Sequence, residues 1–180
     1  MVLLDYVSLA NFTTASKTSS MTIRPAVPSD ANAIWSILEP TIRAGETYTL
    51  PREMDREQAL AYWFSSGHAV FVAEDDGEVL GTYYVRANQK GGGAHVANCG
   101  YMTATQASGR GVASAMCEHS LEYARAHGFR AMQFNFVVSS NKTAIHLWEK
   151  FGFDTIGRLP DAFLHPSLGY VDALVMYRLL

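Results

Sequence analysis

Residues 106–113 read Gln106-Ala107-Ser108-Gly109-Arg110-Gly111-Val112-Ala113, a glycine-containing segment between two regular elements. A strand is predicted before it, ending near residue 103. An amphipathic helix is predicted after it, because apolar residues recur at helical spacing from Val112 to Ala124. Glycines allow positive φ and let the backbone approach a ligand closely. The unpaired N–H groups and the dipole of the helix's first turn then favour an anion, most naturally a pyrophosphate.

Two common phosphate-binding loops do not fit this segment. A Walker loop ends in Gly-Lys-Ser/Thr, and that ending is missing here. The dinucleotide fingerprint needs a third glycine beyond Gly109 and Gly111, and it lies early in its domain. The structural alternative is a strand-to-helix turn that requires glycines for its own geometry. Arg110 either adds a charge-assisted contact to the anion or projects into water.

The remaining pattern predicts an α/β domain. A strand over residues 22–24 precedes a helix that Ser29 or Asp30 caps and that ends before Pro40, followed by a short helix and loop over 41–54. The later elements are a helix with a capping box at Asp55 and Gln58, strands over 68–74, 79–85, 95–103 and 132–137, a helix after 111, a helix capped by Asn141, and strands over 153–159 and 169–178 joined by a loop around Pro160 and Pro166. The order is βααβββαβαββ, without an internal repeat.

The composition indicates a single domain with a substantial core. The chain has 180 residues, of which 48% are hydrophobic and 17% are charged. A formal net charge of -3 supplies no basic field for a phosphate backbone, so nucleic acid is not expected as a partner. Cys99 and Cys117 are predicted to be buried free thiols, because two cysteines make neither a disulfide framework nor a zinc pattern. The histidines show no paired spacing, and no metal is predicted.

Residues 1–20 differ from the rest of the chain, since they are rich in Ser and Thr, carry few charges and show no clear period. The folded domain is expected over residues 21–180, with residues 1–20 an N-terminal extension or the result of an upstream start site. The extension is too short and too polar for a membrane span or a signal peptide, which favours a cytoplasmic protein without a membrane partner. This segment and the strand over 169–178 are both compatible with a homodimer.

A second motif follows the glycine segment. It consists of Asn141-Lys142-Thr143-Ala144 and then Trp148-Glu149-Lys150-Phe151-Gly152-Phe153. Together, the two motifs resemble the Gln/Arg-x-x-Gly-x-Gly/Ala loop and the Asn-x-x-Ala-x-x-x-Tyr-Glu-Lys-x-Gly-Phe segment of the GCN5-related N-acetyltransferases (GNAT). The element order agrees over residues 21–180. The resemblance implies the GNAT fold, a mixed and mostly antiparallel central sheet in which a splayed strand pair holds acetyl-CoA.

The resemblance also implies which residues contact acetyl-CoA. Backbone groups of Tyr101, Met102 and Thr103 would bind the pantetheine arm, and an N–H near Tyr101 or Met102 is the candidate oxyanion donor. Asn141 would contact the cofactor near the arm or the thioester, or cap its helix, and one side chain can do both. The pyrophosphate would be held by the N–H groups of Ser108, Gly109, Arg110, Gly111, Val112 and Ala113.

The implied activity is transfer of an acetyl group to the amine of a small molecule, such as an amino acid or a toxic amino-acid analogue. The loop with Glu46 resembles the substrate-facing loop of phosphinothricin-type acetyltransferases, so Glu46 is a candidate base. Asn98, Asn135 and Trp148 resemble positions of fungal acetyltransferases that act on azetidine-2-carboxylate, in which asparagines orient substrate and cofactor. A buried amide must be hydrogen-bonded, so each asparagine is either a structural tie or a substrate contact.

Trp148 departs from the family pattern, because many members have a tyrosine there as general acid for the departing CoA thiolate. An indole N–H cannot usefully release a proton, and a core aromatic residue is the favoured interpretation. A CoA thiol is acidic enough to leave as thiolate without help. Three alternatives remain at this point: acetylation of a protein N-terminus or lysine, a non-catalytic CoA-binding sensor, and a nucleotide-binding α/β domain.

Overall fold

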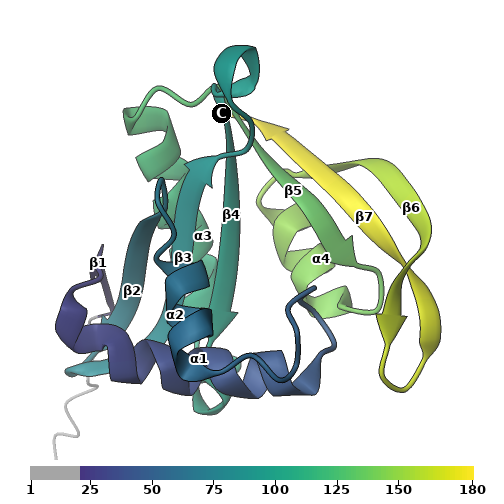
Figure 1. Cartoon of the computed structure of the whole chain (residues 1–180). Helices are drawn as coiled ribbons and strands as arrows, with labels where there is room; N and C mark the ends of the chain where they lie inside the picture. Colours follow the sequence, from purple (N-terminus) through teal and green to yellow (C-terminus); the bar gives the residue numbers. More distant parts are fainter. Residues whose placement is uncertain (1–20) are drawn as a thin grey trace, which may run out of the picture.

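The computed structural model describes residues 21–180, and the predictions for residues 1–20 lie outside this part of the chain. The described strands are β1 (Thr22–Pro25), β2 (Ala69–Asp75), β3 (Glu78–Ala87), β4 (Val96–Thr103), β5 (Ala131–Val138), β6 (Asp154–His165) and β7 (Gly169–Leu179). They form one sheet in the order β1-β2-β3-β4-β5-β7-β6 (Figure 1). Only the β4–β5 pair is parallel, so the predicted mixed and mostly antiparallel sheet is confirmed.

Four α-helices of the described chain cover the two faces of the sheet. They are α1 (Ala31–Ala44), α2 (Arg56–Trp63), α3 (Val112–Ala126) and α4 (Lys142–Lys150), which confirms the predicted order βααβββαβαββ. α1 and α2 lie on one face, and α3 lies on the other (Figure 1). α4 shares the α3 side, because its Trp148 packs against Tyr101, whose hydroxyl bonds to Ser120 of α3.

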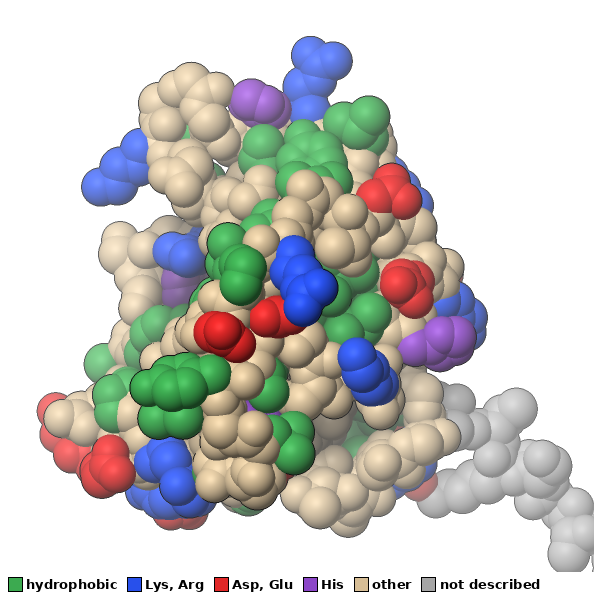
Figure 2. All heavy atoms as spheres, turned by 90° about the vertical axis from the view of Figure 1, so that its right-hand side faces the viewer, with side chains coloured by type: hydrophobic (Ala, Val, Ile, Leu, Met, Phe, Trp, Pro, Cys, Tyr) green, Lys and Arg blue, Asp and Glu red, His purple; other side chains and the backbone are tan. Residues whose placement is uncertain are grey.

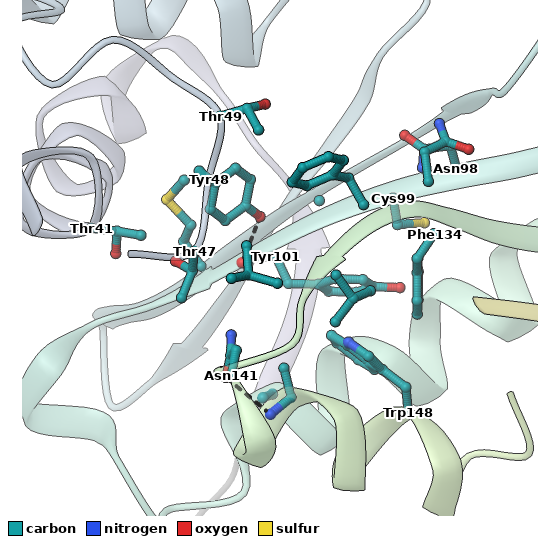
Figure 3. Close-up of a pocket in the computed structure, with 18 of the residues that line it drawn as sticks. Thr41, Thr47, Tyr48, Thr49, Asn98, Cys99, Tyr101, Phe134, Asn141 and Trp148 are labelled. Carbon is teal, nitrogen blue, oxygen red and sulfur yellow. Dashed lines mark hydrogen bonds between the residues drawn. The ribbon is translucent and has the colours of Figure 1, made fainter. Parts of the chain in front are cut away.

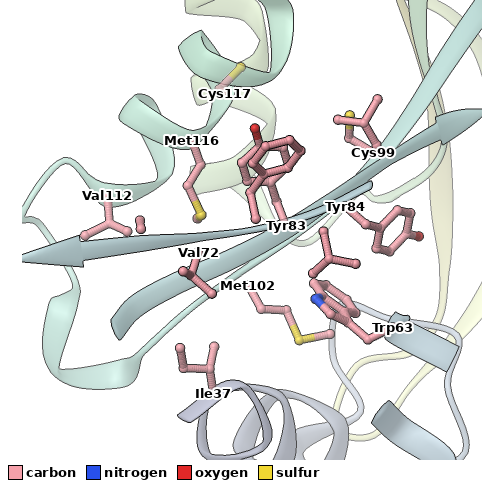
Figure 4. Close-up of a cluster of buried hydrophobic side chains, with 14 of the residues drawn as sticks. Ile37, Trp63, Val72, Tyr83, Tyr84, Cys99, Met102, Val112, Met116 and Cys117 are labelled. Carbon is pink, nitrogen blue, oxygen red and sulfur yellow. The ribbon is translucent and has the colours of Figure 1, made fainter. Parts of the chain in front are cut away.

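Side chains from both faces of the central strands form the core. Tyr83 of β3 points to the side of Met116 and Cys117 on α3, whereas Tyr84 points toward Trp63 of α2 (Figure 4). Successive strand residues face opposite sides, so of these two tyrosines only Tyr84 lies on the α2 side. Cys117 and Cys99 are both buried and free, which confirms the prediction for the thiols.

The predicted helix end before Pro40 is wrong, because α1 continues to Ala44. A proline has no N–H, so the carbonyl four residues earlier, that of Ser36, loses its helical partner. Pro40 and Ser36 are both exposed, and water can therefore replace the missing bond. Burial of the opposite face, which includes Ile37 and Ile42, holds the helix together through this point.

The predicted loop around Pro160 is also wrong, because β6 extends through this residue. β6 is an edge strand, where a proline can direct its missing N–H away from the ladder. The register shifts between Leu159 and Phe163, and Asp161 has a φ of 50°, so the strand passes the proline through a bulge. Only the segment around Pro166 remains as the turn between β6 and β7.

The central parallel pair separates after two positions. Val96 pairs with Ala131 and Ala97 pairs with Met132, after which β4 and β5 have no further partners in each other. Figure 1 shows the two strands diverging from that point. The divergence leaves one backbone edge of each strand without a strand partner, as the predicted splayed pair requires.

The β6–β7 hairpin exposes several large apolar side chains. The most exposed among them are Leu179, Tyr170, Leu164, Leu168 and Ile156. On this side of the molecule, hydrophobic side chains lie among acidic and basic ones (Figure 2). This mixed surface does not by itself establish an interface, and the homodimer stays a prediction. No helix between residues 21 and 180 has the length and apolar character needed to cross a membrane.

Candidate active site

A cleft of about 450 Å³ lies where β4 and β5 diverge. Its lining includes Thr47 and Tyr48 from the loop after α1, Tyr101 from β4, Phe134 from β5 and Trp148 from α4 (Figure 3). A cavity of this size lies within the range of small-molecule sites. Residues from elements far apart in the sequence thus meet at the predicted splayed pair.

The backbone of β4 is oriented by its pairing with β3. The Val96 carbonyl accepts a hydrogen bond from the Asn88 N–H, and the Ala104 N–H donates to the Leu80 carbonyl. Backbone groups alternate sides along a strand, so the even-numbered residues of β4 turn their N–H and C=O toward β3. The odd-numbered residues turn theirs toward the cleft.

Tyr101 and Thr103 therefore present backbone groups to the cleft, whereas the backbone of Met102 faces β3. The Tyr48 hydroxyl donates to the Tyr101 carbonyl at 2.8 Å, which agrees with this orientation (Figure 3). Met102 also lines the cleft. The two candidate oxyanion donors are the N–H groups of Tyr101 and Met102. Only the Tyr101 N–H faces the cleft.

The glycine segment forms an open turn at the start of α3. Gly109 and Gly111 have φ of 76° and 79°, which a side chain would strain. Within the described chain, the N–H groups of Gly109, Gly111, Val112 and Ala113 have no hydrogen-bond acceptor. The N–H groups of Ser108 and Arg110 instead donate to carbonyls of the preceding 3-10 turn. Four of the six predicted pyrophosphate donors are therefore free for an anion.

The Arg110 side chain neither enters the turn nor projects freely into water. Its Nη2 lies 2.8 Å from a carboxylate oxygen of Asp75, which is 8% exposed. The pair joins the glycine turn to the end of β2. The anion-binding capacity of the turn therefore comes from backbone N–H groups and the helix dipole rather than from this arginine.

Asn141 caps α4, as the sequence predicts. Its Oδ1 accepts a hydrogen bond from the Ala144 N–H at 3.2 Å. The side chain also lines the cleft, with its amide nitrogen turned toward Tyr101 (Figure 3). Capping therefore uses the oxygen and leaves the nitrogen available to a ligand.

Asn98 joins β4 to β5 immediately after their last paired residues. Its Nδ2 donates to the Gln133 carbonyl at 2.9 Å, and its Oδ1 accepts from the Arg86 Nε at 3.4 Å. Asn98 is 6% exposed and lines the cleft. The side chain satisfies a carbonyl that the splayed strands would otherwise leave unpaired, so a structural tie is present.

Asn135 is one step further along β5 and also lines the cleft. Its Oδ1 accepts from the Gln133 side chain at 2.8 Å, and its Nδ2 donates to the Asn88 Oδ1 at 2.7 Å. Asn98 and Asn135 thus share Gln133 as a partner. The two predicted residues are brought together in one polar network on the α1/α2 side of the sheet.

Three tyrosines that the sequence does not single out as site residues border the same side of the cleft. Tyr48 comes from the loop after α1, Tyr62 from α2 and Tyr84 from β3. The Tyr62 and Tyr84 hydroxyls lie 3.3 Å apart. Burial raises the pKa of Tyr48 and of Tyr84 well above its ordinary range, so both hydroxyls stay protonated. We call these three residues the tyrosine wall.

Arg86 is a further cleft residue that the motifs do not reveal. It pairs with Asn98 across β3 and β4, and it lines the cleft beside the tyrosine wall. The only signal in the sequence is its position two residues after Tyr84, on the same face of the strand.

The family of the chain follows from comparison with known proteins. Residues 32–153 match the acetyltransferase (GNAT) family. The chain belongs to this family. A solved GCN5-related N-acetyltransferase from Kribbella flavida is 43% identical, with a TM-score of 0.85 over 89% of this chain and 98% of that one.

Two further acetyltransferases are similar. A phosphinothricin acetyltransferase from Sinorhizobium meliloti, solved in complex with AcCoA, shares the fold at 23% identity, with a TM-score of 0.77 over 89% of this chain and 88% of that one. N-acetyltransferase aca1 of Schizosaccharomyces pombe is 26% identical over 151 residues, which are 74% of this chain and 72% of that protein. This GNAT protein is thus an acetyltransferase, and acetyl-CoA is its acetyl donor.

Glu46 lies apart from the other predicted site residues of this GNAT protein. It is exposed and borders a separate shallow hollow with Thr41, Thr47 and Thr105. Thr41 and Thr47 also line the main cleft, so the carboxylate sits beside the cleft rather than in its lining.

Trp148 and Cys99 contribute packing to the GNAT site. Trp148 is 8% exposed and packs against Tyr101 and Phe134, at centroid distances of 5.0 and 4.8 Å. The prediction of a core aromatic residue is confirmed. Burial raises the pKa of the Cys99 thiol to about 12, so this cleft-lining cysteine stays protonated and is a poor nucleophile.

Proposed function

We propose that this GNAT protein is an N-acetyltransferase that acetylates the amine of a small molecule, such as an amino acid or a toxic amino-acid analogue. The observation that carries the proposal is the cleft itself. Its volume of about 450 Å³ must hold the acetyl end of the donor as well as the acceptor. The tyrosine wall bounds the acceptor side, which favours a small molecule over a protein chain in an extended groove.

Donor binding is proposed at two places along the cleft. The backbone groups of Tyr101 and Thr103 would bond the pantetheine arm, and Asn141 would contact it through its amide nitrogen. The free N–H groups of the glycine turn, including those of Gly111 and Ala113, would hold the pyrophosphate at the start of α3. The support is the alternation of β4 and the absence of other acceptors for these N–H groups in residues 21–180.

Direct transfer is the proposed reaction. The amine nitrogen attacks the thioester carbon, the carbonyl electron pair moves to oxygen, and the Tyr101 N–H stabilises the resulting oxyanion. The oxyanion electron pair then re-forms the C=O bond as the C–S bond breaks, CoA leaves as thiolate, and the proton remaining on the newly acylated nitrogen passes to solvent. The protonated state of the Cys99 thiol supports this route over one with an acetylated cysteine.

The amine must lose a proton before it attacks. An alkyl amine is neutral in only about one molecule per thousand at pH 7. Glu46 is the proposed candidate for accepting this proton through water, because it borders the neighbouring hollow with Thr41 and Thr47, two residues that also line the cleft. Orientation of the two reactants in the cleft supplies much of the remaining rate advantage.

Asn98 and Asn135 are proposed to orient the acceptor and the donor. Both side-chain amides already have hydrogen-bond partners in the protein. Each asparagine would therefore act by holding the neighbouring polar side chains in place and by contacting the ligand directly in the cleft. We expect Asn135→Ala to lower kcat/KM by at least about tenfold, the value of one charge-assisted or well-oriented hydrogen bond. A kcat/KM within twofold of the wild-type value would make Asn135 purely structural.

Thermal unfolding with and without acetyl-CoA is the first test of donor binding. At a donor concentration of 100 times the Kd, binding adds roughly 2.7 kcal/mol to the free energy of unfolding. For a domain of this size we expect Tm to rise by about 5–10 °C. ATP and NAD serve as controls, and a larger shift with either of them would contradict the assignment.

Release of free CoA thiol in the presence of an amine panel then tests the reaction. Acetylation of small amines without acetylation of peptides is the expected result. Preferred acetylation of peptide N-termini or lysines would favour a protein acceptor. Donor binding without thiol release for any amine or peptide would instead favour a non-catalytic CoA sensor.

A further inference from the structure

We propose that Arg86 recognises a carboxylate on the acceptor, and that the acceptors are therefore small amino or imino acids. The inference rests on the proposed function, because it concerns the acceptor side of the same cleft. It adds the residue that selects the substrate and the chemical group that this residue selects.

Arg86 is the charged residue of the cleft lining. The other lining residues are tyrosines, threonines, asparagines, small residues and apolar side chains, all uncharged at neutral pH. Burial chiefly lowers the pKa of the nearby His68, and the Arg86 charge lowers it further, so this ring adds no second positive charge. The acceptor side therefore carries one fixed positive charge.

No carboxylate of residues 21–180 forms an ion pair with Arg86. The contrast with Arg24 and Arg110 is informative, because each of these arginines lies within 3 Å of a carboxylate oxygen, at 2.7 and 2.8 Å. A positive charge in a partly buried cleft attracts an anion from solution. Arg86 is half-buried, so a bound anion would be less screened than at the surface.

Asn98 orients the Arg86 guanidinium for binding a carboxylate. The Asn98 amide donates to the Gln133 carbonyl, which directs its oxygen toward the Arg86 Nε. That bond occupies one donor of the guanidinium and leaves the two terminal Nη groups for a ligand. The planar fork of an arginine matches the two oxygens of a carboxylate.

Arg86 lies too far from the start of α3 to bind the phosphates of the cofactor. Gly81 of β3 packs against Val112 at the start of α3, where a Cβ on Gly81 would lie 2.7 Å from the valine. Arg86 is five residues further along the extended strand, about 17 Å away. The pyrophosphate turn and the arginine thus lie at opposite ends of the cleft, with the reacting space near Tyr101 between them.

The distance to the reacting space limits the acceptor. Asn98, which contacts Arg86, is three residues from Tyr101 along β4, a separation of about 10 Å. The arginine side chain and a molecule with its amine one or two atoms from its carboxylate can together span this gap. The amine then reaches the thioester while the carboxylate stays at the guanidinium.

Matched acceptor pairs test the inference. Phosphinothricin, methionine sulfoximine and azetidine-2-carboxylate are each compared with their carboxamides, and kcat/KM is measured by CoA thiol release. A carboxamide lowers the pKa of the neighbouring amine and so makes it more available for attack. Preference for the carboxylate therefore cannot arise from amine reactivity.

We expect the wild-type protein to prefer the carboxylates, and Arg86→Gln to lower their kcat/KM by about 10- to 100-fold, the value of a charge-assisted contact. The carboxamides should change less than threefold. Arg86→Lys should retain part of the preference through its charge. Arg125→Gln removes the same charge from the exposed surface of α3 and is the matched control. The Tm shift with acetyl-CoA should be the same in all variants.

The outcomes separate the two proposals. No turnover of any amine by the wild-type protein would defeat the proposed function itself. Turnover with equal kcat/KM for carboxylate and carboxamide, or an unchanged preference in Arg86→Gln, would overturn only the role of Arg86. A loss of the acetyl-CoA shift in Arg86→Gln would also overturn it, since the residue would then act on the donor side.

Discussion

Gly100 shows how one residue controls the position of a cleft side chain. A Cβ at this position would lie 2.7 Å from the Cε1, 2.8 Å from the Cζ and 2.9 Å from the hydroxyl oxygen of Tyr84. The Tyr84 ring cannot move aside freely, because His68 stacks on it at 4.1 Å and Trp63 packs edge-on at 5.0 Å. The glycine therefore allows the tyrosine wall to lie against β4.

Gly100→Ala is expected to lower both stability and activity. Overpacking should reduce the free energy of unfolding by about 1–3 kcal/mol, and displacement of Tyr84 should reduce kcat/KM for the acceptor. Gly92→Ala is the control, because a Cβ there meets nothing within 4 Å and its φ is not positive. Urea unfolding and steady-state kinetics check both effects, and equal behaviour of the two variants would contradict the packing argument.

At the scale of an element, the glycine turn before α3 depends on backbone groups alone. Gly111 has a φ of 79°, and a Cβ there would project into open space beside the free N–H groups. Gly91, in the distant turn before β4, has a φ of 55° and equally open surroundings. The two glycines form a matched pair that differs in its distance from the proposed anion site.

Gly111→Ala is expected to raise the Kd for acetyl-CoA by at least about tenfold, because the methyl group narrows the anion site and one misplaced charge-assisted bond has roughly this effect. Gly91→Ala should change the Kd less than twofold. Both variants should lose about 1 kcal/mol of stability from the strained φ. Isothermal titration and thermal unfolding measure the two quantities. Similar donor affinities in the two variants would remove the pyrophosphate site from this turn.

The attachment of β1 and α1 to the sheet depends on charged side chains. Arg24 of β1 bonds to Asp30 before α1 at 2.7 Å and to Glu74 of β2 at 2.6 Å. The Asp30 carboxylate is 6% exposed and also accepts from the Val27 N–H at 2.8 Å. The hydrogen bond from Arg24 is the largest cause of a lowered pKa of Asp30. The network ties the first strand and helix to the sheet.

Asp30→Asn should lower the free energy of unfolding at pH 7 by about 1.5–3 kcal/mol, the value of hydrogen bonds to a charged group. A lowered folded-state pKa stabilises the fold above the unfolded-state pKa, about 3.9. This contribution is lost as pH falls through the folded-state pKa. The difference in the free energy of unfolding between Asp30→Asn and the wild type should therefore shrink below pH 4. Glu39→Gln removes an exposed ion pair and should cost less than about 0.5 kcal/mol at any pH. A pH-independent difference for Asp30→Asn would rule out the charge network as its cause.

At the scale of the whole molecule, the pH dependence of the rate distinguishes acceptor chemistry from enzyme chemistry. Burial keeps the cleft hydroxyls of Tyr48 and Tyr84 and the Cys99 thiol protonated through pH 9. We expect kcat/KM to rise about tenfold per pH unit until it reaches the pKa of the acceptor amine. The inflection should move when acceptors of different amine pKa are compared.

Glu46→Gln is the companion variant. Because this carboxylate is exposed and borders only the neighbouring hollow, we expect its loss to lower kcat/KM less than about tenfold, well below the roughly 100-fold or more that an obligatory general base contributes. An inflection at one fixed pH for all acceptors, abolished in Glu46→Gln, would show that Glu46 is the obligatory base.

Local chemistry let the sequence alone predict the element order and an anion-binding turn before α3, whereas the resemblance of two motifs to a known family implied the GNAT fold and acetyl-CoA. Helical and strand periodicity, the capping box at Asp55, the cap at Asn141 and the positive-φ glycines Gly109 and Gly111 each act within a few residues. Such signals are therefore readable without knowledge of the fold. The errors in element bounds at Pro40 and Pro160 have the same explanation, because a proline's cost depends on whether its missing hydrogen bond faces water.

Only the tertiary structure decided which side chains meet in the cleft. Arg86, Asn98 and Asn135 come from three strands, and their contact depends on a pairing register and on the point where β4 and β5 separate. Arg110 forms an ion pair with Asp75, which is 35 residues away in the chain. Hydrogen bonds and charges act over a few ångströms in space, so residues distant in sequence acquire their roles only when the sheet brings them together.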